Sequence, residues 1–258
     1  VELRLRARVV AMSPARRSFS AGSLRVGRMT LELPPHPLAD PHTLHGNGHL
    51  QPWQVLAIRR GGAVLRLDSP ASASWPWRYR GTIRYALSQV QLQVHIDLCN
   101  TDDRPMPAGI GLHPYFRHLP AGEVGYGAGC IWPTNTHQLV DPPRALQSNE
   151  SGTPPQPLPR GSLTRHLGGW DGVVTWQCSP GQEAVLHADP LFGHLVVHRP
   201  DPPHYLCLEP VSHVANGFNL ADSGAAGTGT RILAPGESMS GRVDIALMPG
   251  PRTRDTRP

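Results

Sequence analysis

His113 lies in the stretch DRPMPAGIGLHPYFRHLP, where two glycines precede it and a proline follows it. An imidazole can take up and release a proton near neutral pH, so it is a candidate for acid–base chemistry. If residues 109–116 are extended, alternate side chains share a face, and that face carries Gly109, Gly111, His113 and Tyr115. We expect the glycines to leave a hollow beside the imidazole in which a ligand binds. The other interpretation is a core histidine that is hydrogen-bonded by a neighbour.

A carboxylate ends a second apolar run, PHYLCLEPVSH at residues 203–213. The same alternation predicts that Leu206 and Leu208 face the core. Tyr205, Cys207 and Glu209 then share the opposite face. Glu209 is therefore either an exposed residue at a strand end or a residue of a functional site, and the local pattern leaves both interpretations open.

Histidines are concentrated in HPLADPHTLHGNGHLQPWQV, residues 36–55, at positions 36, 42, 45 and 49. Imidazoles bind zinc well, but the spacing matches no H-E-x-x-H motif and no cysteine lies nearby. We expect no metal site here. His45 and Gly46 instead fit a turn that presents one imidazole at a strand end.

Another candidate is Asp171 in HLGGWDGVVTW, residues 166–176. This aspartate either shapes a turn or accepts hydrogen bonds from a polyhydroxyl ligand, to which Trp170 would offer a flat apolar face.

The elements that must position these residues are strands. In residues 89–100, apolar side chains alternate with polar ones at a period of two, which predicts a strand with one buried face. Similar runs occupy 53–59, 63–69, 82–88, 194–200, 204–210 and 242–248. The sequence thus predicts an all-β sandwich or barrel in one domain. The Pro-rich residues 141–161 read as a linker or, in better agreement with a single domain, as a long loop.

Composition limits the classes of function. The chain has 258 residues, a net charge of +5 and scattered arginines without any lysine, a bias that suggests a bacterial source. No basic stripe predicts nucleic-acid binding, and no apolar stretch is long enough for a membrane helix. The four cysteines form no C-x-x-C pair, so we expect free thiols in the cytoplasm. Nucleotide-binding glycine motifs and hydrolase signatures are absent from the sequence.

Four stretches, in their order and spacing, resemble the aldose 1-epimerase (galactose mutarotase-like) family. They are LHGNGHLQPWQV, NTDDRPMPAGIGLHPYF, LGGWDG and CLEPVSHVANGFNL. The resemblance extends from about residue 24 to residue 247. It implies a large antiparallel β-sandwich with a concave sugar-binding face, and a mutarotase that interconverts the α and β anomers of an aldose without a metal or other cofactor.

The resemblance also implies roles. His113 matches the general acid on the ring oxygen and Glu209 the general base on the anomeric hydroxyl. His45 matches a substrate-orienting histidine, and Asp171 matches an aspartate that holds sugar hydroxyls. Tyr115 and Trp170 are further candidates for sugar binding. We expect a small-molecule sugar as the partner of a monomer or homodimer.

The N-terminal residues 1–22 depart from the family pattern, which normally has further strands and an Asn-Arg pair that contacts the sugar. Arg16 or Arg17 is nearest to the expected place, and we take Arg17 as a candidate sugar ligand. We expect the β-sandwich at 23–248, with some N-terminal strands missing and an uncovered sheet edge. The tail, 249–258, is expected to be disordered.

The sequence leaves alternatives open for the substrate and for the activity itself. Many relatives have an aromatic residue and an arginine where this chain has His49 and Gln51. An arginine would suit a phosphorylated sugar, so its absence favours a free aldohexose over a hexose 6-phosphate. The divergent N-terminus is compatible with a sugar-binding protein without turnover, or with an inactive truncated product.

Overall fold

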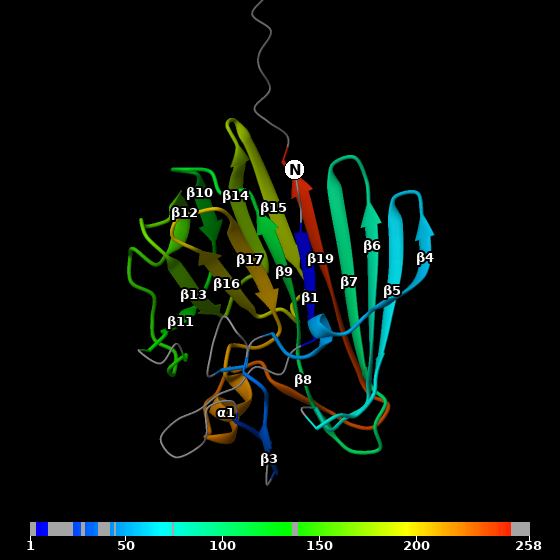
Figure 1. Cartoon of the computed structure of the whole chain (residues 1–258). Coiled ribbons are helices and arrows are strands. Elements are labelled where there is room, and N and C mark those ends of the chain that lie inside the picture. The colour runs from blue at the N-terminus through cyan, green and yellow to red at the C-terminus, as the bar shows by residue number, and fades with distance from the viewer. Residues whose placement is uncertain are drawn as a thin grey trace, which may run out of the picture.

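A computed structural model describes residues 4–9, 23–26, 29–35, 42–43, 45–73, 75–135 and 139–248. Strands dominate these ranges, and the helices there are the 3₁₀ turn η1 (Gly48–Leu50) and the short helix α1 (Gly217–Asp222) (Figure 1). Residues 10–22 and 249–258 lie outside the described residues. Arg17 and the expected C-terminal tail therefore lie outside them as well.

Two large antiparallel sheets contain most of the strand residues of the described chain. The six-stranded sheet has the order β1 (Arg4–Val9), β9 (Ile110–Phe116), β17 (Leu206–Val211), β16 (His194–Arg199), β13 (Leu163–Gly168) and β11 (Cys130–Trp132). The nine-stranded sheet has the order β12 (Gly152–Pro157), β10 (Glu123–Tyr126), β14 (Val173–Ser179), β15 (Gln182–Ala188), β19 (Ser238–Leu247), β7 (Gln91–Asn100), β6 (Tyr79–Leu87), β5 (Gly62–Ser69) and β4 (Gln54–Arg59).

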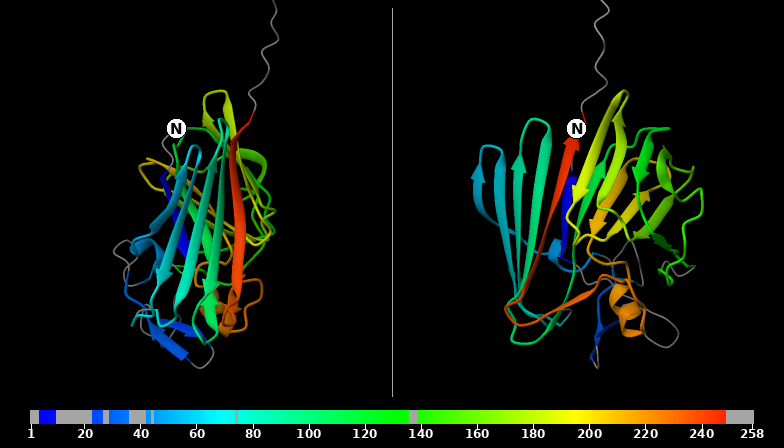
Figure 2. Two further views of the ribbon diagram at one scale, coloured as in Figure 1. Left: turned by 90° about the vertical axis from the view of Figure 1, so that its right-hand side faces the viewer. Right: turned by 180° about the vertical axis from the view of Figure 1, so that it is seen from behind.

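Smaller pairs complete the described sheets. They are β2 (Ser23–Val26) with β3 (Met29–Glu32), and β8 (Met106–Ala108) with β18 (Arg231–Leu233). The two large sheets are seen from the side and from behind in Figure 2. The prediction of an all-β antiparallel sandwich is confirmed.

The core lies between the sheets because each strand alternates apolar and polar side chains. From the six-stranded sheet, Ile110, Leu112 and Leu208 are fully buried in the same hydrophobic cluster as Val94 and Ile96 of β7. The opposite face of the six-stranded sheet is left for His113, Glu209 and their neighbours, so the patterning that builds the core also places the candidate site.

Two segments differ from expectation. Arg4–Val9 form β1, which pairs with β9 in a register that places Arg6 beside His113, so the β9 edge is covered. The expected loop 141–161 contains β12, which pairs with β10. Its prolines mask the strand pattern, but an edge strand has one side without ladder partners and tolerates them.

Candidate active site

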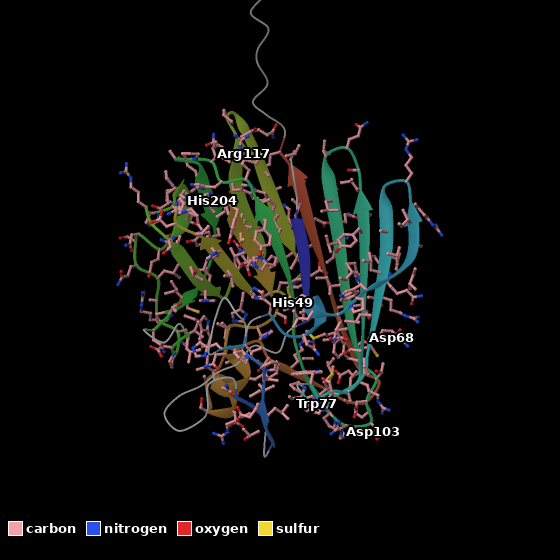
Figure 3. The ribbon with its side chains drawn as sticks, viewed as in Figure 1. His49, Asp68, Trp77, Asp103, Arg117 and His204 are labelled. Atoms are coloured by element: carbon pink, nitrogen blue, oxygen red, sulfur yellow. The ribbon has the colours of Figure 1, made fainter. Side chains whose placement is uncertain are left out.

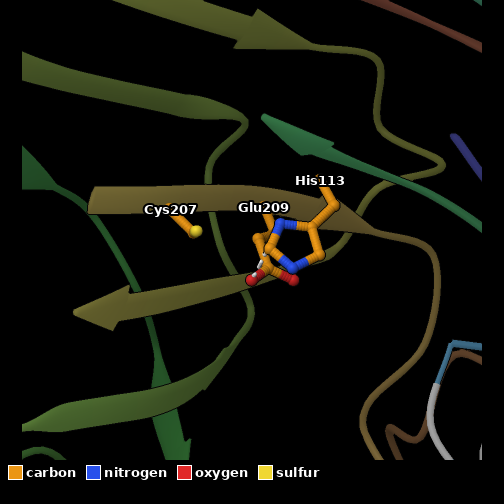
Figure 4. Close-up of side chains that lie close together, drawn as sticks. All are labelled: His113, Cys207 and Glu209. Carbon is orange, nitrogen blue, oxygen red and sulfur yellow. Dashed lines mark ion pairs between the residues drawn. The ribbon is translucent and has the colours of Figure 1, made fainter. Parts of the chain in front are cut away.

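His113 and Glu209 face each other across neighbouring strands. The antiparallel register of β9 and β17 pairs Tyr115 with Cys207 and Gly111 with Val211, which sets His113 opposite Glu209. The imidazole Nδ1 lies 3.5 Å from the Glu209 carboxylate Oε1 (Figure 4). Their exposed fractions are 5% and 2%. Two residues that are far apart in the sequence therefore form one buried acid–base pair.

Tyr115 fixes the other side of the imidazole. Its ring stacks on that of His113 with centroids 4.5 Å apart and an interplanar angle of 11°. The phenol oxygen lies 3.3 Å from Nε2. One ring nitrogen thus faces Glu209 and the other faces a hydroxyl, which defines the orientation of the imidazole before any ligand arrives.

His45 approaches the pair from a different part of the chain. It has a positive φ of 69° and is followed by Gly46 at 62°, so the backbone bends in the left-handed region, as the predicted turn requires. Its ring lies 5.2 Å from that of His113 and 5.7 Å from that of His49, edge-on to both. Figure 3 shows His49 on the segment that reaches β4. This turn therefore brings a second imidazole to the site.

Asp171 lies in the turn between β13 and β14. Gly169 and Gly172 have positive φ values of 58° and 85° and allow the turn. The exposed Asp171 accepts a hydrogen bond from the Val173 backbone N–H at 3.0 Å. One carboxylate oxygen thus shapes the turn, which agrees with the local interpretation of this aspartate.

Trp170 differs from expectation. It is 6% exposed and belongs to the hydrophobic core, and its indole N–H donates to the Val173 carbonyl at 2.8 Å. Packing covers its ring, so it does not present the flat open face that the sequence suggested. Its apolar area is used to anchor the β13–β14 turn instead.

The two glycines before His113 also have a different role from the one predicted. A Cβ at Gly109 would lie 2.2 Å from the imidazole Nδ1 of His213. A Cβ at Gly111 would lie 2.7 Å from Val211 Cγ1. The glycines therefore admit the neighbouring strand and loop, and do not make room for a ligand beside His113.

Cys207 and Tyr205 complete the cluster, on the same face as Glu209 as the alternation predicted, although the sequence pattern assigned them no role. Cys207 is fully buried, and the Tyr205 ring lies 5.0 Å from that of Tyr115. Burial raises the pKa of the Tyr205 phenol, and Cys207 and Glu209 raise it further. A neutral phenol at this place is a hydrogen-bond donor to a polar ligand.

No helix within the described ranges combines the length and the apolar character needed to cross a membrane.

Comparisons with known proteins agree with this fold. Residues 23–246 match the model of the aldose 1-epimerase family. A relative from Escherichia coli strain K12, the uncharacterized protein YphB, is 26% identical over 229 residues, which cover 84% of this chain and 75% of YphB.

Solved structures show the same fold. A crystal structure of an Escherichia coli K12 protein has a TM-score of 0.79 and 24% identity, and the match covers 89% of this chain and 79% of that one. A galactose mutarotase-like protein from Clostridium acetobutylicum has a TM-score of 0.75 and 17% identity, with 95% and 79% covered.

Proposed function

The chain belongs to the aldose 1-epimerase family, and from this membership we propose that it interconverts the α and β anomers of a free aldohexose. Membership of this family makes the chain an isomerase. The observation that carries the proposal is the contact of 3.5 Å between His113 Nδ1 and Glu209 Oε1 on one face of one sheet.

The chemistry explains why these two groups must be neighbours. Opening the pyranose requires that Glu209 takes the proton of the C1 hydroxyl while His113 gives a proton to the ring oxygen, and the bond from C1 to that oxygen breaks. Both oxygens are bonded to C1, so an acid and a base that serve them must lie side by side. Rotation about C1–C2 and the reverse transfers then close the ring as the other anomer.

The surrounding side chains supply orientation. Tyr115 holds the imidazole by stacking and through its hydroxyl. His45 contacts that imidazole edge-on and is assigned to a sugar hydroxyl. The Asp171 carboxylate is exposed at its turn and is assigned to accept further sugar hydroxyls.

A free sugar is favoured over a phosphorylated one by the neutral side chain of Gln51. Its amide Nε2 donates to the Ser69 hydroxyl at 2.9 Å and to the Tyr79 hydroxyl at 3.2 Å. An arginine at this place would offer the charged, two-pronged donor that phosphate prefers. Gln51 does not, so we assign a neutral aldohexose as the substrate.

The test is the rate of anomer exchange, followed by polarimetry from pure α-glucose and α-galactose. We expect the wild type to accelerate exchange and Glu209→Gln to lower kcat/KM by about 10²–10⁴-fold, because a positioned base is lost. Glu183→Gln, at an exposed glutamate of β15, is the matched control and should behave as the wild type. Glu209→Gln with the wild-type rate would refute the proposal. Sugar binding in calorimetry without exchange would identify a binding protein instead.

A further inference from the structure

One cluster of metal-ligating groups contains a thiol, that of Cys207, which has no role in the proposed acid–base reaction. Cys207 lies two residues before Glu209 on β17, so the thiol and the carboxylate share a face, and His113 faces them from β9. One ligand atom from each residue lies within 4.8 Å of the other two. Figure 4 shows the three side chains converging from the two strands.

We propose that His113, Cys207 and Glu209 form a binding site for a soft or borderline divalent cation such as Zn²⁺. An imidazole nitrogen, a thiolate and a carboxylate oxygen are the ligand types that zinc binds in proteins. Thiolate selects zinc and cadmium, while Mg²⁺ and Ca²⁺ prefer sets made of oxygen. The histidines at 36–49 are not part of this set, although His45 lies beside His113.

The geometry needs only a small contraction. Bond lengths of about 2.0–2.3 Å place tetrahedral ligands roughly 3.3–3.8 Å apart. The His113–Glu209 contact of 3.5 Å already lies in this range. The upper limit of 4.8 Å for the cluster therefore requires a movement of at most about 1 Å. Three protein ligands leave the fourth tetrahedral position for water.

The cluster is almost completely buried. The three residues are 5%, 0% and 2% exposed in the order of the chain. In such surroundings a bound cation interacts strongly with the Glu209 carboxylate and with the Cys207 thiolate that forms on binding, because little water screens their charges. Binding is coordination without redox change: the Cys207 thiol releases its proton to solvent as the sulfur–metal bond forms.

Occupancy would have a consequence for catalysis, and this step rests on the proposed function. The cation occupies the His113 nitrogen that would carry the donated proton and the Glu209 oxygen that would accept one. Bound Zn²⁺ therefore inhibits anomer exchange by competing with the sugar for these groups.

The test uses the full chain without sugar and titrates it with Cd²⁺ as a spectroscopic probe of thiolate ligation. We expect an ultraviolet thiolate-to-cadmium band that saturates at one equivalent and that Zn²⁺ displaces, while excess Mg²⁺ does not. Cys207→Ser should abolish the band and weaken binding by on the order of 100-fold, because the soft ligand is lost. Cys178→Ser, at a free cysteine of β14, is the matched control and should keep both band and affinity.

A second variant keeps the inference testable if Cys207→Ser does not fold. Glu209→Gln retains the thiol, so the band should persist while the affinity falls by about 10-fold. A wild type without a saturable band, or a folded Cys207→Ser with unchanged affinity, would overturn the metal site. Failure of the proposed function is seen separately, as absent anomer exchange in metal-free protein.

Discussion

At the scale of single residues, the proposed chemistry depends on which proton each member of the His113–Glu209 pair holds. Ring opening in the assigned direction needs an ionised carboxylate and a protonated imidazole at the same time. The two groups contact each other directly, so they can form an imidazolium–carboxylate pair when His113 holds its proton. The proton states that catalysis needs are thus the states that the contact favours.

This pair predicts the pH dependence of the rate. In the wild type, kcat/KM should rise as the carboxylate ionises and fall as the imidazolium loses its proton, which gives a bell. His113→Gln should remove the alkaline limb and leave a low rate that keeps only the acid limb set by Glu209, measured as anomer exchange between about pH 4 and 9. His204→Gln, at an exposed histidine, should keep the bell. An unchanged alkaline limb in His113→Gln would contradict the role of this histidine.

At the scale of strands, the alternation of side chains explains both the core and the site. Leu206 and Leu208 point to the core, and the residues between and after them, Cys207 and Glu209, point to the other face. Close packing of β9 against the segment after β17 is made possible by glycine. At Gly109 there is no room for even one methyl group, because the His213 imidazole fills the space.

The contact at Gly109 predicts a loss of stability on substitution. Gly109→Ala should lower the free energy of unfolding by about 1–3 kcal/mol, because the added Cβ displaces a buried ring. Gly193→Ala is the matched control, since nothing lies within 4 Å of its Cβ. That change should be neutral or slightly stabilising. Thermal and urea unfolding of both variants measure the difference, and equal stabilities would show that the His213 contact imposes no constraint.

Strand patterns made part of this fold predictable from sequence. Residues 89–100 have a clear period of two and contain β7, in which buried and half-buried side chains alternate over most of the strand. The strands β10 and β11 are short, and β12 is rich in proline, so their signal is too weak for a period to emerge. The segment of β1 was likewise not identified as a strand, because its place is set by pairing with β9.

The candidate site was predictable to a similar extent. Alternation placed His113 and Glu209 on strand faces opposite the core. The family resemblance then assigned both residues to one active site. What local pattern could not supply is register between strands, so the approach of Cys207 to the pair and the burial of Trp170 emerge only in three dimensions. The role of Gly109 was missed for the same reason, because His213 comes from another segment.

At the scale of the whole molecule, burial of polar groups links stability to pH. His194 lies on β16 with 5% of its surface exposed, and its Nε2 lies 3.0 Å from the Gly227 carbonyl oxygen. Burial lowers the pKa of His194 below its ordinary value of 6.5, although backbone hydrogen bonds to Gly227 and Ser212 oppose the shift. Near the ordinary pKa of histidine, His194 is therefore protonated less often in the folded protein than in the unfolded chain.

This shift predicts that acid weakens the fold. Because the unfolded state binds more protons, the free energy of unfolding should fall as the pH drops through about 6.5. For one histidine the slope is at most about 1.4 kcal/mol per pH unit. His194→Gln should reduce that slope between about pH 7.5 and 5.5, measured by urea unfolding at each pH. His204→Gln should not change it, and an unaltered slope in His194→Gln would show that this histidine is not the group responsible.

If His113 and Glu209 open the sugar ring as one unit, a double-mutant cycle on kcat/KM for anomer exchange reveals their coupling. When two groups act as a unit, removing either one abolishes the contribution of both. Each single variant, His113→Gln or Glu209→Gln, should therefore lower kcat/KM about as much as the double variant does. We therefore expect the double variant to lie within about 10-fold of the slower single variant. Losses that multiply, with the double variant slower by the product of both single effects, would show that the two residues act independently and would refute ring opening by a coupled pair.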